Sequence, residues 1–254
     1  SLNVPAVRTV VMVSPEAFRR QLELFGLPLR EGGDYYGYSL ALGSAEVSLL
    51  NLTNAYRALA RGGLRCPVRL KPAAAKADLA AGCQRALDAG AAFIVGDILS
   101  DRNARARTFG TDSILATRFW SAVKTGTSKD MRDNWAVGYS PRYTVGVWVG
   151  NASGAAMWDV SGTSGAAPVW AELMQALHAG SPVRPPAAPP GVVRTAVRFG
   201  DGLEAPRSEW FLPGTAQSLF AIDNAATSEG AVSTNGQNRS ELQYPVLAVP
   251  PRIT

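Results

Sequence analysis

Three short runs rich in valine, threonine, tyrosine and tryptophan limit the fold of this chain more than any other feature. They cover residues 118–128, 134–140 and 143–151, and turn residues bound each of them. β-Branched and aromatic residues in short bounded runs are typical of strands. Residues 140–142 (Ser-Pro-Arg) have the length of a hairpin turn, so we expect antiparallel neighbours.

Helical periodicity surrounds these runs. The predicted helices cover residues 14–25, 45–61, 87–99 and 166–179. A Ser-Pro start and a following Gly bound the first, a Gly-Gly pair ends the second, and two glycines interrupt the third. In the second helix we expect Val47, Leu50, Ala55 and Leu59 to point inward. Helices followed by an antiparallel meander and a covering helix predict an α+β sandwich.

Composition and charge exclude several classes of protein. With 46% hydrophobic and 18% charged residues, the chain is neither disordered nor fibrous. The net charge of +5 is dispersed, and the densest basic group, Arg102, Arg105 and Arg107, lacks interleaved aromatics. We therefore expect a solvated basic loop there and no nucleic-acid partner. No apolar stretch approaches the roughly 18 residues of a membrane span.

The cysteine and histidine content argues against a metal site. Cys66 and Cys83 have no companion ligands for zinc, and both a disulfide and two separate buried thiols remain open. The single histidine, His178, falls on the last helical turn, where we expect a structural role. Trp120, Trp135 and Trp148 lie in the strand runs and are expected in the core.

Prolines clustered within residues 182–190 mark the end of the main domain, which we expect to cover residues 1–180. Residues 181–254 are predicted to be a Pro-rich linker and the entry to a following module. Strand-like pieces at 192–199 and 244–249 are scattered there without a full core pattern.

A Lys-Thr-Gly-Thr sequence on the first strand run is the most specific candidate site. On an extended strand Thr125 and Thr127 project from one face and can hydrogen-bond a carboxylate. Gly126 lets a ligand approach the backbone, and Lys124 supplies a positive charge. A plain surface strand is the alternative.

A Ser-x-Asn sequence opens the chain. In an extended loop the hydroxyl of Ser1 and the carboxamide of Asn3 can face one cavity, although a helix N-cap role for Ser1 is the alternative. We expect this loop to share a cavity with the Lys-Thr-Gly strand. The charged run 132–134 is either a cleft rim or a solvated turn.

Segments 1–8, 41–63, 97–110 and 123–151 resemble the transpeptidase domain of class A penicillin-binding proteins. The resemblance covers nearly all of the first 180 residues, and the family combines S-x-x-K, S-x-N and K-T-G motifs. It implies a serine β-lactamase-like sandwich with helices packed on an antiparallel sheet. It also implies a peptidoglycan D,D-transpeptidase that works by serine acyl transfer, without metal or organic cofactor.

The resemblance implies a role for each matching residue. Ser1 would relay protons between Lys124 and the leaving amine, and Asn3 would hold that lysine and the substrate amide. Thr125 and Thr127 would bind the carboxylate of a D-alanyl-D-alanine stem peptide or of a β-lactam. The backbone N–H of Thr127 would be one of two oxyanion donors.

The chain departs from the family at its nucleophile. The S-x-x-K motif lies upstream of S-x-N in the family, and this sequence begins at S-x-N. The string Ser121-Ala122-Val123-Lys124 overlaps the strand, where residues three apart point to opposite faces. We therefore expect an N-terminally truncated piece that neither acylates nor turns over substrate alone.

Truncation also bears on location and assembly. We expect the parent protein to face the periplasm, anchored in the cytoplasmic membrane through missing N-terminal sequence. The piece should expose apolar sheet edges and faces, and form a homodimer or repack.

Two other functions remain open. A non-catalytic module could keep the pocket to bind cell-wall material or β-lactams. A D,D-carboxypeptidase or serine β-lactamase would need a deacylating water and its base, and Asp101, Asp130 and Asp133 show no spacing that provides one.

Overall fold

The three strand runs form one antiparallel sheet. In the computed structural model, which describes residues 2–71, 80–110, 112–180, 183–200 and 204–220, the strands are β3 (Ala122–Thr127), β4 (Asp133–Tyr139) and β5 (Thr144–Gly150). Their order is β3-β4-β5, and both pairings are antiparallel. Ser140 N–H donates to Tyr143 O over 2.8 Å and closes the predicted hairpin turn. The expected strands and their direction are confirmed.

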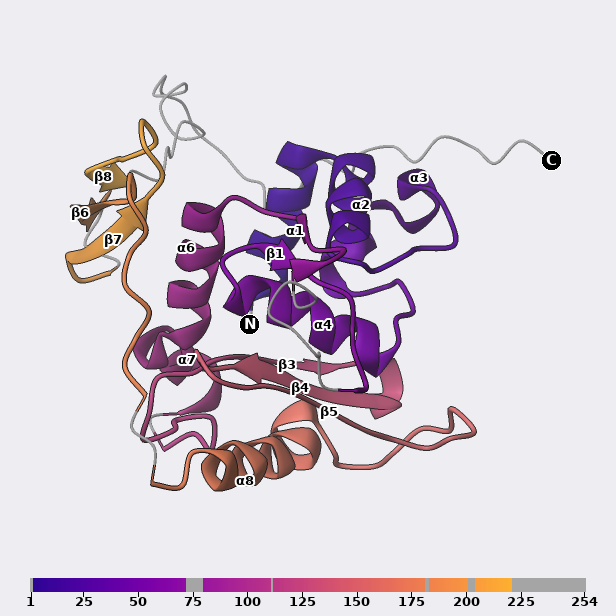
Figure 1. Ribbon diagram of the computed structural model, residues 1–254. Helices are drawn as coiled ribbons and strands as arrows, with labels where there is room; N and C mark the ends of the chain where they lie inside the picture. The colour runs from indigo at the N-terminus through magenta and orange to yellow at the C-terminus, as the bar shows by residue number, and fades with distance from the viewer. Residues whose placement is uncertain (1, 72–79, 111, 181–182, 201–203, 221–254) are drawn as a thin grey trace, which may run out of the picture.

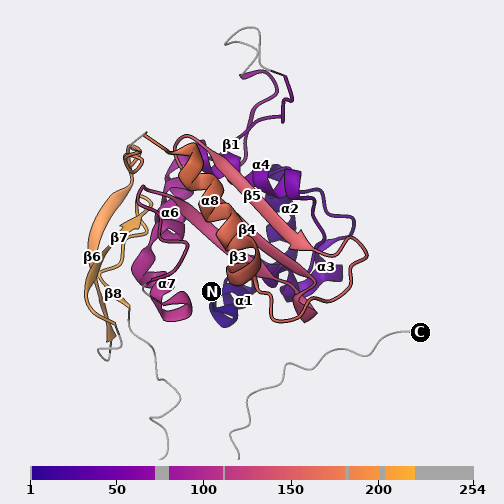
Figure 2. The same ribbon diagram turned by 90° about the horizontal axis from the view of Figure 1, so that it is seen from below.

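One helix, α8 (Ala167–Leu177), covers one face of this sheet (Figures 1 and 2). A short π-helical turn, η3 (Gly162–Ala166), leads into it. Trp170 and Met174 of α8 are fully buried with Val123 of β3 and Leu115 in one apolar cluster. The Trp170 ring lies so close to β4 that a Cβ at Gly138 would meet it at 2.6 Å. Apolar burial of this kind is the main stabilising force between a helix and a sheet.

The helices before α8 lie on the opposite side of the sheet from it, except α7, which lies level with the strands (Figure 1). They are α1 (Asn3–Val13), α2 (Pro15–Leu24), α3 (Gly33–Tyr36), η1 (Gly37–Leu42), α4 (Leu49–Ala60), α6 (Ala89–Ser100) and α7 (Arg102–Phe109). A short turn, η2 (Lys129–Met131), joins β3 to β4. Helices on both faces of an antiparallel sheet confirm the α+β sandwich.

The predicted helix ends are partly right. Ser14 caps α2 by accepting from Ala17 N–H, as its sequence position predicts. The helix predicted over 45–61 begins only at Leu49, because the Ser48 hydroxyl accepts from Asn51 N–H and caps it there. Val47 therefore lies outside α4. Leu50, expected inward, is 57% exposed, and the buried positions are Ala55 and Ala58.

Two glycines fit α6 to its neighbours instead of breaking it. A Cβ at Gly96 would lie 2.9 Å from the Tyr139 hydroxyl, and one at Gly90 would lie 2.9 Å from Leu212 and Val192. The helix is confirmed, and its glycines allow close packing on both sides.

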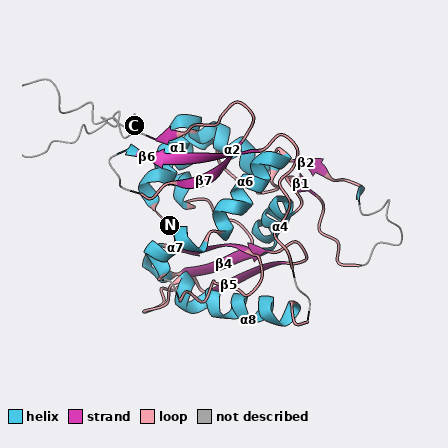
Figure 3. Ribbon diagram, turned by 90° about the vertical axis from the view of Figure 1, so that its left-hand side faces the viewer, coloured by secondary structure: helices cyan, strands magenta, loops and turns pink. Residues whose placement is uncertain are grey.

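A small second sheet lies beside α6 (Figure 3). It contains β6 (Val193–Phe199), β7 (Arg207–Phe211) and β8 (Leu219–Phe220), in the order β7-β6-β8. Trp210 of β7 packs edge-on against Phe93 of α6, with ring centroids 5.3 Å apart. The sequence pattern indicated only scattered strand pieces in this region. The piece at 244–249 lies outside the described residues.

A disulfide settles the question of the cysteines. Cys66 and Cys83 are bonded, next to a two-stranded pairing of β1 (Leu64–Arg65) with β2 (Gln84–Arg85). The bond holds the two ends of the intervening segment together.

Other expectations are corrected. The basic group near residue 102 lies on α7 and not in a loop, where Arg102 donates to Thr117 O and Arg105 to Leu99 O. The expected core tryptophans are only half-buried. Trp135 and Trp148 pair with each other across β4 and β5, with ring centroids 6.4 Å apart. Packing by α8 covers only one face of the sheet fully, which leaves these rings at its margin.

His178 has the expected structural role. Its buried ring stacks on Phe119, its Nδ1 lies 2.7 Å from Met174 O, and its Nε2 lies 2.9 Å from Ser140 Oγ. Because a carbonyl oxygen only accepts, Nδ1 carries the proton. The histidine thus ties the end of α8 to the hairpin turn between β4 and β5.

Candidate functional site

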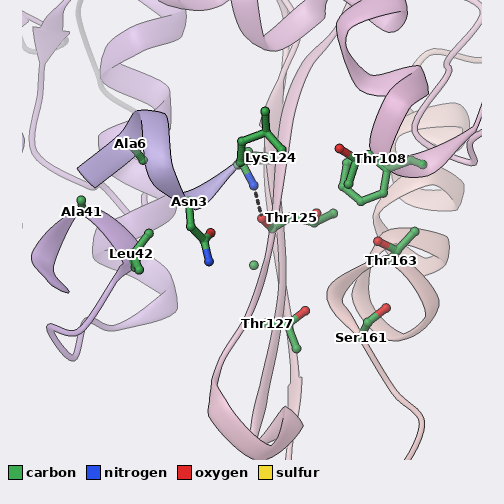
Figure 4. A pocket seen from close by; sticks show the side chains of 13 residues that line it. Asn3, Ala6, Ala41, Leu42, Thr108, Lys124, Thr125, Thr127, Ser161 and Thr163 are labelled. Carbon is green, nitrogen blue, oxygen red and sulfur yellow. Dashed lines mark hydrogen bonds between the residues drawn. The ribbon is translucent and has the colours of Figure 1, made fainter. Parts of the chain in front are cut away.

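A cleft of about 710 Å³ runs along strand β3 (Figure 4). Five regions of the chain line it: Leu2, Asn3 and Ala6 at α1; Ala41 and Leu42 at η1; Thr108 and Phe109 at the end of α7; residues 124–127 of β3; and Ser161 and Thr163 around the start of η3. The cleft brings Asn3 beside the Lys-Thr-Gly-Thr segment, although 120 residues separate them in the sequence.

The alternation of β3 divides the cleft into two sides. Thr125 and Thr127 project from the same face as Val123, which packs in the core under α8. Lys124 projects to the other side of the strand, where Asn3 lies (Figure 4). The cleft therefore has a hydroxyl-bearing side next to η3 and a side with an amine and a carboxamide next to α1.

Lys124 carries the charge of the site. Its ammonium donates to the carbonyl oxygen of Thr125 over 2.7 Å, and burial lowers its pKa below the ordinary 10.5. It is the only charged side chain among the described residues that line the cleft. An anion that enters the cleft therefore meets a positively charged side chain.

Thr127 is held by the turn across from it. Gly162 N–H donates to Thr127 Oγ1 over 2.9 Å. The two segments touch so closely that a Cβ at Gly162 would lie 2.5 Å from Gly126 O. Thr125 is a buried residue, whereas Thr127 at the end of the strand is exposed.

The Ser-x-Asn part of the site is corrected in its local structure. Asn3 is the first residue of α1, not part of an extended loop, and Leu2 occupies the N-cap position. Asn3 still lines the cleft, because the first turn of α1 lies against it. Ser1 lies outside the described residues.

The string from Ser121 to Lys124 does not form a nucleophile and base. Ser121 is buried, its hydroxyl bonds with that of Thr117 over 2.9 Å, and it is not among the described residues that line the cleft. Lys124 lies in the cleft. The prediction that these two residues face apart is confirmed.

The charged run at 132–134 has a structural place. Asp133 accepts from Ser128 Oγ over 2.8 Å and from Trp148 Nε1 over 2.9 Å, and Asn134 is fully buried. None of the three lines the cleft in the described part of the chain. They fix the turn after β3 and do not form the cleft rim.

Sequence reasoning missed the lining residues that carry no motif. Thr108, Phe109, Ser161 and Thr163 reach the cleft through packing of α7 and η3. Of these four residues only Ser161 belongs to a local pattern, because it forms a reciprocal capping box with Ser164 that starts η3.

The described residues contain no cluster of three or more His, Cys, Asp or Glu that could hold a metal ion. In the same part of the chain, no helix combines the length and apolar character needed to cross a bilayer.

Comparison with protein-family models finds none that matches the chain. Penicillin-binding protein 1C of Escherichia coli (strain K12) is 30% identical over 226 residues, covering 85% of this chain and 28% of that protein. Penicillin-binding protein 2D of Bacillus subtilis (strain 168) is 29% identical, covering 81% of this chain and 32% of that protein. The chain thus spans about a third or less of the length of these relatives.

Two solved structures share the fold. Penicillin-binding protein 1A from Haemophilus influenzae matches with a TM-score of 0.67 and 20% identity, covering 84% of this chain and 39% of that one. The PonA1 protein from Mycobacterium tuberculosis in complex with penicillin V matches with a TM-score of 0.54 and 22% identity, over 72% of this chain and 55% of that one.

Proposed function

Because the chain belongs to the class A penicillin-binding proteins, we propose that it is part of a peptidoglycan D,D-transpeptidase whose cleft along β3 binds the carboxylate end of a stem peptide. The observation that carries the proposal is the shared cleft of Asn3 and the Lys-Thr-Gly-Thr strand. A D-alanyl-D-alanine terminus and a β-lactam both present a carboxylate beside a carbonyl. One arrangement of donors therefore suits both.

Each residue has a proposed task. Thr125 and Thr127 donate hydrogen bonds to the ligand carboxylate, and Gly126 lets the ligand approach the strand backbone on the side of Lys124. Lys124 supplies the positive field, and Asn3 holds the ligand amide. The backbone N–H of Thr127 is one oxyanion donor, and Ser1 relays protons to the leaving amine.

We further propose that this 254-residue polypeptide forms no acyl-enzyme by itself. Its one S-x-x-K string begins at Ser121, which is buried against Thr117. The expected intact mass after incubation with penicillin G equals that of the untreated chain. A mass gain of one penicillin would contradict the proposal.

The wider setting is proposed on the same basis. The protein works on the periplasmic side of the cytoplasmic membrane. Residues 181–254 link the domain at 1–180 to a following module. The 254-residue chain associates as a homodimer, and a monomeric mass by light scattering at micromolar concentration would contradict that last point.

Binding of a short stem-peptide analogue tests the function directly. The probe is diacetyl-Lys-D-Ala-D-Ala, compared with its C-terminal amide in calorimetric titrations of the wild-type chain. We expect the acid to bind at least about tenfold more tightly, since a charged hydrogen-bonded group contributes about 1.5–3 kcal/mol.

Lys124→Gln should remove most of this preference, because it deletes the charge and keeps a polar side chain. Lys129→Gln, an exposed lysine in the turn after β3, is the matched control and should bind like wild type. Equal binding of acid and amide by the wild-type chain would refute the carboxylate site.

A further inference from the structure

The turn that enters α8 forms a second wall of the cleft, opposite the strand threonines. Ser161 and Thr163 line the cleft from this turn, and no motif of the sequence assigns them to the site. Figure 4 shows the hydroxyl oxygen of Thr163 turned toward β3, on the side of the strand where Thr125 and Thr127 project. Two separate elements thus direct hydroxyl groups into one space.

We propose that Thr163 is a specificity-determining residue whose hydroxyl binds the ligand carboxylate together with Thr125 and Thr127. The inference rests on the proposed function, because it names a further donor for the same ligand. The pocket would then have hydroxyl donors on two sides, and these would select a free carboxylate over a C-terminal amide.

The turn orients the hydroxyl of Thr127. A threonine hydroxyl has one proton to donate and two lone pairs that accept. Gly162 N–H occupies a lone pair of Thr127 Oγ1. The hydroxyl proton of Thr127 therefore stays available for the ligand. The turn that enters α8 thus lines one side of the cleft and also orients a donor on the opposite side.

The turn is held firmly enough to position a donor. Ser164 N–H donates to Ser161 Oγ over 3.3 Å, and Ser161 N–H donates to Ser164 Oγ over 2.9 Å. The helix that follows is anchored by the fully buried Trp170 and Met174. A donor on rigid support loses little entropy when the ligand binds.

The hydroxyl of Thr163 has no hydrogen bond within the described part of the chain, and its residue is half-buried at the cleft wall. No acidic side chain lines the cleft among the described residues, and Lys124 contributes a positive charge from the other side of β3. Hydroxyl donors in a cleft lined by a cationic side chain favour an anion. A carboxylate can accept from three hydroxyls, whereas an amide terminus would direct its own N–H groups at the same donors.

The same peptide pair tests the proposal with three forms of the full 254-residue chain. Thr163→Val keeps the side-chain shape and removes the hydroxyl, whereas Thr163→Ser restores the hydroxyl without the methyl group. We expect Thr163→Val to bind the acid about tenfold more weakly and the amide unchanged, and Thr163→Ser to recover most of the acid affinity.

Controls separate this result from a loss of structure. Thr9→Val removes an exposed hydroxyl on α1 that bonds to Pro5 O and should bind both peptides like wild type. Thermal unfolding of Thr163→Val should match that of the wild-type chain within a few degrees.

The outcomes distinguish the two proposals. If wild type prefers the acid and Thr163→Val keeps the full preference, the role of Thr163 is refuted and the carboxylate site stands. If wild type shows no preference, or binds neither peptide, the proposed function fails and the role of Thr163 fails with it. Equal weakening of acid and amide in Thr163→Val would also refute a carboxylate-specific role.

Discussion

The two sides of the cleft are built on very different amounts of packing. On the α8 side, Trp170 and Met174 are completely buried against the sheet. On the α1 side, Val10 is the buried residue of the helix, while Met12 is 86% and Leu2 70% exposed. Both helices are apolar, so composition alone does not separate them. The difference indicates that the threonine side of the site is fixed by tertiary packing, whereas Asn3 stands on a helix with much weaker support.

The largest test of this comparison removes the central ring on the α8 side. Trp170→Ala should lower the free energy of unfolding by about 3–5 kcal/mol, because it leaves a cavity where the indole filled the core. Met12→Ala on α1 should change it by less than about 0.5 kcal/mol. Urea unfolding of both variants measures the two changes in unfolding free energy. Similar losses in Trp170→Ala and Met12→Ala would show that the α8 side and the α1 side of the cleft are equally well packed.

A smaller effect is expected where the α8 side meets β3. In Gly162→Ala the new Cβ would lie 2.5 Å from Gly126 O, so the two segments must separate. Overpacking of this kind costs about 1–3 kcal/mol and should weaken the bond from residue 162 to Thr127.

Gly32→Ala is the matched control for that change, since nothing lies within 4 Å of the Cβ position at Gly32. Urea midpoints and binding of the acid peptide measure both effects. Unchanged stability and binding in Gly162→Ala would show that the contact between the turn and β3 is not tight.

The smallest expected effect concerns how the stability of the chain depends on pH through Glu16 of α2, which lies on the same side of the sheet as α1. Hydrogen bonds from Arg19, Gly33 and Arg20 to the Glu16 carboxylate lower its pKa from 4.5 to about 2. A lowered folded-state pKa contributes stability above pH 4.5 that is lost as the pH falls toward 2. Glu16→Gln should therefore show a shallower loss of stability over that interval.

Urea midpoints measured between neutral pH and pH 2 follow this loss, with Glu31→Gln as the control for removing an exposed carboxyl. The effect is screened because the Glu16 carboxyl is open to solvent. Identical pH profiles of stability for Glu16→Gln and wild type would show that the hydrogen bonds to Glu16 do not stabilise the folded chain.

Local features of the fold could be predicted because the residues that decide them are neighbours in the sequence. The period of two along 122–127 places Thr125 and Thr127 on one face. Ser14 and Pro15 start a helix through bonds within its first turn. Even here the helix predicted from residue 45 begins only at Leu49, because Ser48 caps it there.

Features that depend on distant segments could not be predicted in the same way. The sequence placed Trp135 and Trp148 in the core, yet the covering helix leaves them half-buried and buries Trp170 instead. Thr163 carries no motif and enters the site only because η3 lies against β3. Which side of a strand a helix covers depends on how all layers pack together.

The sequence by itself determined the strand run, the alternation that directs Lys124 away from the two threonines, and the likeness to penicillin-binding proteins. These rest on backbone geometry and on residue types a few positions apart. Only the tertiary structure decided that Asn3 begins a helix beside that strand, that Cys66 bonds Cys83, and that Thr163 faces the threonine pair. Contacts between segments that are not neighbours in the sequence depend on how the layers bury apolar surface against one another, which no local pattern specifies.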